Sequence, residues 1–410
     1  MELTRTKFKK TEVGLIPEDW DTPLLSDIKT LMTNGFVGTA KTEYTNSSNG
    51  VLYIQGYNVI ANGFDFHGIK KVNVDFHKRN AKSCLKEGDL LTVQTGDVGL
   101  TTFVPKHLEG SNCHALIITR FNISRVHYLF MAHYFNSNMG RGRMKELETG
   151  TTMKHLNVGE MFNWRVPLPP TLTEQKAIAT ALSDVDELIA NLEKLIEKKK
   201  AIKKGTIQEK LKPKAHWETK QIRDLAKYRR GSFPQPYGLS KWYDDVKGTP
   251  FVQVVDVDDN KKLKRETKAR ISKEGQQFSV FVPKGSIILT IQGSIGRICI
   301  TDYDTYVDRT LLIFESFQVE FDKYFFMMSI FLKFEIEKEK APGGIIKTIT
   351  KEALSSFEIS YPPIEEQVSI SGIINSIELE IETLKIKHEK LKIIKQGMMQ
   401  ELLTGRTRLV

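Results

Sequence analysis

The chain has 410 residues, of which 40% are hydrophobic, 9% aromatic and 27% charged. This ordinary globular composition excludes a disordered chain, and the length exceeds what one hydrophobic core normally needs. Sixty Lys and Arg against 50 Asp and Glu leave a net charge of +10, which favours an anionic partner, with nucleic acid ahead of a membrane.

Three cysteines, Cys84, Cys113 and Cys299, are widely separated and odd in number. They cannot form a disulfide framework or a paired metal motif, so we expect a reducing cytoplasm. Met1–Arg5 lacks the apolar core of a secretion signal. The longest apolar stretch, Tyr324–Leu332, is too short to span a bilayer, so no membrane partner is expected.

The sequence repeats itself once, at an offset of about 197 residues that drifts to about 192. The matched segments keep their order along the chain: Trp20 with Trp217, Tyr53-Ile54-Gln55 with Phe251-Val252-Gln253, Tyr128-Leu129-Phe130-Met131 with Tyr324-Phe325-Phe326-Met327, and Pro169-Pro170/Glu174-Gln175 with Pro362-Pro363/Glu366-Gln367. The middle of each copy shares glycines and apolar positions but few polar residues. The repeat therefore predicts one scaffold that carries two different surfaces.

In chain order, the first copy opens with a globular part from Leu3 to about Val166, and the second with one from about Pro213 to Glu358. Short β-branched runs bounded by glycines, such as Asp89–Val93 and Ser286–Ile291, predict strands in both. The segments near Tyr128 and Tyr324 predict helices. We expect mixed α and β structure, with parallel or antiparallel strand order left open.

Each copy ends in a predicted long helix, because Pro170 and Pro363 precede about three dozen residues without another proline. Thr173 is expected to cap the first helix. Apolar residues recur at a heptad spacing in both helices. The residues expected to pack between the helices are Ile178, Val185, Leu188, Leu192, Leu195, Ile370, Ile377, Leu384, Leu391 and Ile394.

Such a stripe cannot be buried by one helix alone, so we expect an antiparallel coiled coil that joins the two globular parts. Parallel packing would require an awkward return after Lys212-Pro213-Lys214. The alternative is that each helix packs only on its own globular part, but the stripe is longer than a part of that size needs. The predicted fold class is α+β, with an internal pseudo-twofold repeat.

A search for catalytic motifs finds none in the sequence. There is no phosphate-binding loop of the G-x-x-x-x-G-K-[S/T] type, and Gly96–Gly99 and Gly293–Gly296 are typical of turns. The Pro-Pro pairs lack the preceding Asp or Asn that holds a target amine in amino-methyltransferases. Cys113-His114 lacks two further ligands for a metal site, so we expect a buried thiol beside a polar neighbour. No catalytic residue, metal or cofactor is predicted in this chain.

Four segments together carry a resemblance to a known family: Gly14-Leu15-Ile16-Pro17-Glu18-Asp19-Trp20, Pro169-Pro170 with Glu174-Gln175, Pro362-Pro363 with Glu365-Glu366-Gln367, and Leu402-Leu403-Thr404-Gly405-Arg406. With them, the chain resembles the specificity subunit of type I restriction–modification systems over nearly its whole length. One departure is that Lys214-Ala215-His216 precedes Trp217, where the first copy has Gly-x-Ile-Pro. This departure falls at the start of the second domain.

The resemblance implies a subunit that recognises double-stranded DNA and has no chemistry of its own. Its parts would be target recognition domain 1 at 1–166, a first spacer helix at 167–212, target recognition domain 2 at 213–358 and a second spacer helix at 359–410. Each domain would read one half of a split, asymmetric site, and the helices would set the gap. Two modification subunits would bind S-adenosylmethionine and methylate adenine at N6, and restriction subunits would use ATP and Mg to translocate and cleave DNA.

Basic, amide and aromatic clusters on predicted loops are the candidate DNA contacts, because such side chains bind phosphates and base edges. They are Lys70, Lys71, Lys78, Arg79, Asn80, Arg141 and Arg143 in the first domain, Tyr228, Arg229, Arg230, Ser232, Lys262, Lys264 and Arg265 in the second, and Lys154 and Lys347 at equivalent places. Each has the alternative of being a solvated surface residue, and Lys154 and Lys347 of capping the scaffold. The lysine run from Lys194 to Lys204 is expected on the wet face of the first helix, or to attract the modification subunits or DNA.

Two other functions remain as alternatives. A self-contained DNA-modifying methyltransferase or nuclease would bind S-adenosylmethionine by itself, and the missing Asp/Asn-Pro-Pro-aromatic pocket counts against it. A structural coiled-coil adaptor is disfavoured by the charge of +10 and by the two large globular parts.

Overall fold

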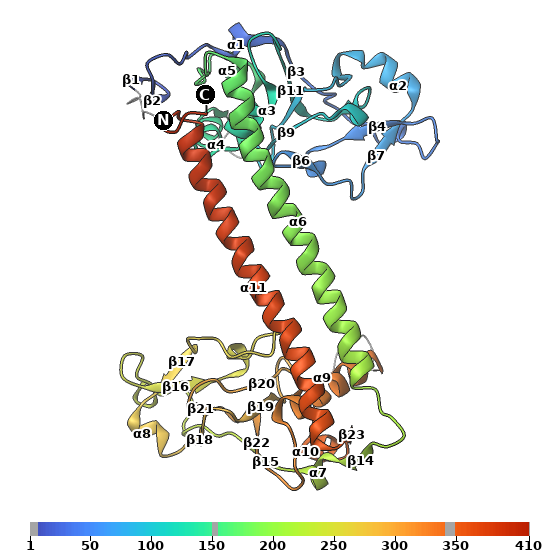
Figure 1. The fold of residues 1–410 in the computed structure, drawn as a ribbon, viewed down its shortest axis with the longest axis vertical. Helices are drawn as coiled ribbons and strands as arrows, with labels where there is room; N and C mark the ends of the chain where they lie inside the picture. The colour runs from blue at the N-terminus through green and yellow to red at the C-terminus, as the bar shows by residue number, and fades with distance from the viewer. Residues whose placement is uncertain (1–6, 150–154, 341–348, 410) are drawn as a thin grey trace. The chain divides into compact units, whose positions relative to one another are not determined.

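The computed structural model describes residues 7–149, 155–340 and 349–409 (Figure 1). It divides into two compact units, one of Met1–Glu193 with Ile386–Val410 and one of Lys194–Lys385. Each unit holds one globular part together with one half of each of the two long helices, α6 (Leu172–Lys210) and α11 (Ile364–Leu402). No helix within the described ranges combines the length and the apolarity that crossing a bilayer requires.

The globular part of the first unit is built on a central antiparallel sheet of order β3-β11-β8-β9. A smaller sheet of order β10-β4-β7 pairs β10 with β4 in parallel and β4 with β7 antiparallel. Its elements are β1 (Phe8–Thr11), β2 (Gly14–Pro17), α1 (Leu25–Ile28), β3 (Lys29–Asn34), η1 (Lys41–Glu43), β4 (Val51–Ile54), η2 (Gly56–Asn58), β5 (Val59–Ile60), β6 (Gly63–Phe64), β7 (Lys70–Val72), α2 (Val74–Arg79), η3 (Ala81–Ser83), β8 (Leu90–Val93), β9 (Thr101–Phe103), η4 (Lys106–Leu108), β10 (Asn112–Cys113), β11 (Leu116–Phe121), α3 (Tyr128–Asn136), α4 (Asn138–Glu146), β12 (Glu148–Thr149), β13 (His155–Leu156) and α5 (Val158–Phe162).

The second unit repeats this plan. Its antiparallel sheet has the order β15-β22-β19-β20, and its second sheet, β17-β16-β21-β18, again contains one parallel pair, β16 with β21. Its elements are β14 (Glu218–Gln221), α7 (Ile222–Leu225), β15 (Ala226–Arg230), η5 (Ser240–Trp242), β16 (Thr249–Val252), η6 (Val254–Asp256), β17 (Ala269–Ile271), α8 (Lys273–Gln276), β18 (Val280–Val282), β19 (Ile287–Thr290), β20 (Ile298–Ile300), β21 (Thr305–Val307), β22 (Leu311–Phe317), α9 (Lys323–Lys340), α10 (Lys351–Ser355) and β23 (Glu358–Tyr361).

The inner strands β8 and β19 of the two central sheets are buried on both faces, which explains why they are almost continuously apolar. All four residues of β8 are buried, and successive side chains point to opposite faces. Leu90 belongs to the core beneath α3, whereas Leu91 belongs to the core shared with the smaller sheet. In β19, Ile287 and Ile288 divide in the same way between two cores. The predicted strands and the helices near Tyr128 and Tyr324 are therefore confirmed.

The long helices pair antiparallel in each unit (Figure 1). In the first unit, Glu193 of α6 lies 2.8 Å from His388 of α11, and Asp186 forms an ion pair with Lys395. In the second unit, Lys199 lies 2.7 Å from Glu380, and Lys203 lies 2.6 Å from Glu378. Residue numbers rise along α6 as they fall along α11. The predicted antiparallel coiled coil is confirmed, and the alternative that each helix packs only on its own globular part is wrong.

The buried seam between the helices is narrower than the predicted stripe. Ile178, Leu192 and Ile370 are buried, and Val185, Ile377, Leu384 and Leu391 are half-buried. Leu188, Leu195 and Ile394 are instead 55, 39 and 43% exposed, so the expectation that they pack between the helices does not hold. Two helices bury only about two positions per heptad.

The glutamines of the Pro-Pro/Glu-Gln segments bind backbone groups at the starts of the two long helices. Gln175 is buried, its Nε2 donates to the carbonyls of Arg125 and Pro169 at 3.0 Å, and its Oε1 accepts from the amide of His127 at 2.8 Å. Gln367 likewise donates to Pro362 and accepts from the amide of Asp322. Each glutamine thus fastens its long helix to the segment that leads into the helix of its own globular part.

The cap of α6 differs from the predicted one. Thr171 lies just before the helix, and its hydroxyl accepts from the amide of Glu174 at 3.2 Å, whereas Thr173 lies inside the helix. A side chain at the N-cap reaches the amide three residues on, so the residue that precedes the first helical position is the one that caps.

The neighbouring glutamates are each held by cations from the segment that follows the other long helix. Arg408 bonds both oxygens of the buried Glu174 and also Asp19, at 2.9 Å for each oxygen of Asp19. In the second unit, Lys214 and His216 lie 2.6 and 2.9 Å from Glu366. Lys214 and His216, which depart from the sequence of the first copy, therefore bind Glu366 as Arg408 binds Glu174. We call each of these ion-pair groups a clamp.

Candidate nucleic-acid interface

The candidate DNA contacts of the first unit lie on regular elements rather than on loops. Lys70 and Lys71 belong to β7, and Lys78 and Arg79 to α2. Lys70, Lys78 and Arg79 are exposed, and the guanidinium of Arg79 lies 3.0 Å from Glu43. Because apolar residues interrupt these clusters at strand and helix spacing, the local sequence folds into β7 and α2, which carry the basic side chains on their outer faces.

Asn80 has a structural role at the end of α2. It is the C-cap residue of that helix, and its side-chain Nδ2 donates to the carbonyl of Phe76 at 2.9 Å. Its own carbonyl accepts from Asn112 at 3.2 Å. With its amide engaged inside the domain, Asn80 is a weaker candidate for reading a base than its place in a basic cluster indicates.

Arg141 and Arg143 lie on helix α4, so their predicted loop position is also wrong. Arg141 forms an ion pair with Asp97 in the turn between β8 and β9, and Arg143 lies 2.8 Å from Glu146 on its own helix. Gly96 and Gly99 of that turn have φ values of +92° and +83°, which confirms the turn prediction. Arg141 therefore holds this turn against α4.

In the second unit, Tyr228, Arg229 and Arg230 lie on strand β15 and not on a loop. Tyr228 packs against Phe314, and its hydroxyl lies 2.5 Å from that of Ser355. Arg229 and Arg230 are exposed, with the Nε of Arg229 4.0 Å from Glu315. Alternation along the strand turns Tyr228 and its neighbour Arg229 to opposite faces.

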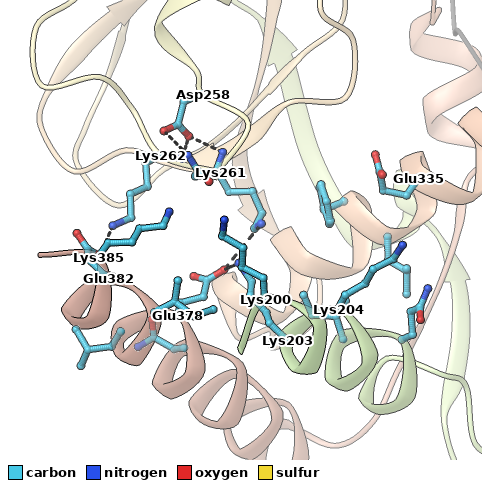
Figure 2. A pocket seen from close by; sticks show the side chains of 18 of the residues that line it. Lys200, Lys203, Lys204, Asp258, Lys261, Lys262, Glu335, Glu378, Glu382 and Lys385 are labelled. Carbon is cyan, nitrogen blue, oxygen red and sulfur yellow. Dashed lines mark hydrogen bonds and ion pairs between the residues drawn. The ribbon is translucent and has the colours of Figure 1, made fainter. Parts of the chain in front are cut away.

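The hydroxyl of Ser232 donates to the carbonyl of Phe278 at 2.9 Å and so tethers the segment after β15. Lys262, Lys264 and Arg265 lie in the segment between η6 and β17 and are exposed, as expected for a loop. Lys262 forms an ion pair with Glu382 at 2.5 Å, as Figure 2 shows. Lys154 and Lys347 lie outside the described residues.

One arrangement that the sequence analysis did not single out occurs in both units. Gln55 directly follows β4, and its Nε2 donates to the hydroxyl of Tyr57 at 3.1 Å. Gln253 directly follows β16, and its Nε2 donates to the hydroxyl of Tyr237 at 3.3 Å. Both tyrosines are more than half exposed. The signal was present in the repeat, since this glutamine is among the few polar residues shared by both copies.

The second unit adds an aromatic and cationic group beside this pair. Phe233 lies 4.6 Å from Tyr237 between ring centroids, and the guanidinium of Arg309 lies 4.7 Å from the Phe233 ring. Arg309 is exposed in the turn before β22 and has no basic neighbours in sequence, so a search for clusters could not find it. These side chains can stack on bases and bind phosphates.

Two cysteine thiols of the described residues are buried. Burial raises the pKa of the thiols of Cys113 and Cys299, which keeps them protonated and poorly nucleophilic at neutral pH. His114 lies 3.0 Å from the hydroxyl of Tyr53, and burial lowers the pKa of its ring. Within the described ranges, no three His, Cys, Asp or Glu side chains are grouped so that they could hold a metal ion.

The sequence of the chain is similar to a known protein family. The sequence model of the type I restriction modification DNA specificity domain matches residues 17–204 and again 214–392. The chain belongs to the type I restriction–modification specificity family. Its role is accordingly that of a specificity subunit, and its repeat corresponds to two copies of the family's domain.

Relatives in an archaeon cover most of the chain. A putative type I restriction enzyme MjaX specificity subunit of Methanocaldococcus jannaschii is 27% identical over 433 residues, which cover 98% of this chain and 96% of the relative. The MjaVIII specificity subunit of the same organism is 26% identical and covers 80% of this chain and 81% of the relative.

Solved structures share the fold of the chain. The S subunit of a type I restriction–modification system from M. genitalium superposes with a TM-score of 0.58 at 13% identity, over 98% of both chains. A chain from a study of complex assembly and conformational transition of the type I R-M system has a TM-score of 0.59 at 16% identity, over 96% of this chain and 99% of the other.

Proposed function

We propose that this chain is the non-catalytic DNA-reading subunit of a type I restriction–modification complex. Each globular part reads one half of an asymmetric bipartite site in double-stranded DNA, and α6 and α11 set the gap between the halves. The domain limits are those expected from the sequence, with recognition domains at 1–166 and 213–358. The complex methylates adenine at N6 through two modification subunits and, with restriction subunits, cleaves DNA at the expense of ATP.

The observation that carries this proposal is a shared scaffold with unlike exposed chemistry. The Gln–Tyr pair occurs in both units, but Tyr237 lies next to Phe233 and Arg309, whereas Tyr57 donates to the carbonyl of Gly68. Two readers of one fold with different side chains recognise different sequences, so the site is expected to be asymmetric.

The shared glutamine has the chemistry of a base-reading side chain. Gln55 donates from Nε2 to Tyr57, and a glutamine amide carries two N–H donors and one carbonyl acceptor. An amide that presents one N–H donor and its carbonyl oxygen matches N7 and N6 of adenine in the major groove. Tyr57 and Tyr237 would orient their glutamines before DNA binds.

Exposed apolar residues on both long helices favour protein partners. Leu188, Leu195 and Ile202 recur every seven residues on α6, and Leu379, Ile386 and Ile393 recur in the same way on α11. The offset of 192 residues that matches Gln175 with Gln367 relates the two sets only to within one position, so they occupy neighbouring and not identical places in the repeat. A stripe of this kind is suited to a partner helix, so each would take one modification subunit.

Methylome sequencing of a strain that expresses the complex tests the reading role. We expect Gln55→Ala to relax one base position in one half of the methylated motif and Gln253→Ala to relax one position in the other half. Each variant is the control for the other. If the wild-type complex methylated without sequence preference, the DNA-reading function would be wrong.

A matched insertion tests the spacing role of the helices. Adding about four residues, roughly one turn, near Lys199 in α6 and beside its partner Glu380 in α11 preserves their pairing. We expect a longer gap between two unchanged half-sites in the methylated motif. An unchanged gap would show that the helices do not set the distance.

A further inference from the structure

The second unit contains a pocket that the reading function does not use (Figure 2). Its volume is about 790 Å³, and it lies between α6, α9, α11 and the turn at 258–262. One wall is apolar and includes Phe331, Leu332 and Leu379. The cationic residues that line it are Lys200, Lys203, Lys204, Lys261, Lys262 and Lys385.

The carboxylates around the pocket do not balance these lysines. Glu378 serves two ammonium groups at once, with Lys203 at 2.6 Å and Lys261 at 3.9 Å. Glu382 is paired with Lys262, and Lys204 and Lys385 have no ion-pair partner among the described residues. The pocket therefore holds positive charge in excess.

Lys261 is the least solvated of these cations. Its side chain is 8% exposed, and its Nζ lies 4.5 Å from the centroid of the Phe331 ring. Its backbone has a φ of +63°, in the left-handed region that disfavours most side chains. The Lys261 ammonium is therefore buried in a strained turn and shares the carboxylate of Glu378 with Lys203. This arrangement lowers the stability of the folded chain unless an anion binds beside the ammonium.

The equivalent turn of the first unit has a neutral residue in place of Lys261. There the turn residue is Asn62, also at positive φ, +56°. Asn62 lies within hydrogen-bonding distance of His133 and Asp186, at 3.1 and 3.3 Å, and accepts from Asn136 at 2.8 Å. Asp186 is paired with Lys395, just as Glu378 is paired with Lys203. The second unit thus has an ammonium where the first has a neutral amide.

We propose that this pocket binds a phosphate-bearing molecule of nucleotide size, with the phosphate between Lys261, Lys203 and Lys204 and an apolar body against Phe331 and Leu332. The volume is that of small-molecule sites, which combine an apolar wall with a few charged groups. A bare phosphate would leave most of the space unfilled. The phosphate comes either from a free nucleotide or from nucleic acid.

Titration of Lys261 gives the binding a characteristic pH dependence. Burial, together with the charge of Lys203, lowers the pKa of Lys261 to about 8, although Glu378 and Asp258 oppose this shift. Three helices pack around Lys261. Lys203 faces Lys261 from α6, and Glu378 faces it from α11. Helix α9 contributes the uncharged Phe331, and its Glu335 also lines the pocket. A bound phosphate favours the ammonium form, so binding takes up a proton and weakens as pH rises above about 8.

Calorimetric titration of the full chain with adenosine 5′-monophosphate, inorganic phosphate and adenosine tests the site. We expect the monophosphate to bind more tightly than inorganic phosphate and adenosine to bind undetectably. Lys261→Asn, which installs the residue of the first unit and tolerates positive φ, should weaken binding at least about tenfold and abolish its pH dependence above pH 8. Lys204→Asn, at an exposed position of α6, should also weaken binding and serves if the first variant fails to fold.

Lys273→Asn on the exposed surface of α8 is the matched control, because it removes the same charge outside the pocket. Equal losses in this control and in the pocket variants, or no monophosphate binding at millimolar concentration, would overturn the proposal. A duplex of unrelated sequence that displaces the monophosphate would identify nucleic acid as the source, and a duplex that does not would identify a free nucleotide. These results are independent of the methylated motif, so the proposed function is tested separately.

Discussion

The two units secure their long helices at the same place with different degrees of burial. In the first unit, the carboxylate of Glu174 is 1% exposed and is held by Arg408, which also reaches Asp19. In the second unit, the equivalent Glu366 is 29% exposed and is held by Lys214 and His216. The repeat preserved the position of the clamp and not its chemistry. What the scaffold requires is therefore a cation at that point, supplied by whichever residue follows the other helix.

Removing Arg408 is expected to have the largest effect on stability. Arg408→Ala leaves the buried Glu174 without a partner, and breaking a buried ion pair in this way costs about 3–5 kcal/mol. Urea unfolding at neutral pH measures the loss. Lys214→Ala, the counterpart in the second unit, should cost less than about 1 kcal/mol because that pair is solvated. Equal losses in the two variants would show that burial does not distinguish the clamps.

The buried glutamines should come next. Gln175→Ala leaves two carbonyls and one amide without a side-chain partner, so we expect a loss of about 2–3 kcal/mol. Gln367→Ala removes one hydrogen bond to a carbonyl and one from an amide, and it should lower the free energy of unfolding by about 1–2 kcal/mol. Hydrogen exchange at the amides of His127 and Asp322 would localise each loss to its own junction. Exchange that stays slow at both amides would contradict the assigned role.

A difference in acid sensitivity distinguishes the units further. Burial lowers the pKa of His133, although Asp186 opposes the shift, and Ser329 occupies the equivalent place in the second unit. The folded state binds this proton less readily than the unfolded chain, whose histidines titrate near pH 6.5. The stability contributed by neutral His133 is therefore complete above about pH 6.5 and is lost as pH falls, by at most about 1.4 kcal/mol per pH unit.

His133→Gln should accordingly make the urea concentration at the unfolding midpoint depend less on pH below about pH 6.5. Hydrogen exchange at backbone amides of the first unit would show that the change occurs there. Ser329→Ala is the matched variant and should leave the slope unaltered. A slope that stays steep in His133→Gln would place the acid sensitivity elsewhere.

The smallest effects are expected where the units are most alike. Lys395→Ala and Lys203→Ala remove the equivalent ion pairs with Asp186 and Glu378, whose side chains are all about a quarter exposed. Each should cost about 0.5–1 kcal/mol, with losses in the two units equal within error. Urea unfolding measures both losses, and a difference of more than about 1 kcal/mol between them would contradict the equivalence of the two ion pairs.

The long helices and the repeat were predictable from the sequence because both depend on patterns that a chain carries locally. Pro-Pro starts, heptad spacing and matched Glu-Gln pairs predicted α6 and α11 and their antiparallel pairing. The candidate contacts were less predictable. Arg141, Arg229 and Arg79 occupy helix or strand positions where the sequence predicts loops, because runs of charged residues also form the outer faces of regular elements.

The duplication, the two long helices and the lack of recognisable catalytic motifs could all be predicted from the amino-acid sequence, since periodicity and residue identity can be read without knowing the fold. Tertiary packing was needed to bring Gln253 to Tyr237 from a different loop and to let Lys261 share Glu378 with Lys203. Charge balance and side-chain orientation depend on residues far apart along the chain, and packing alone brings such residues within a few ångströms of one another.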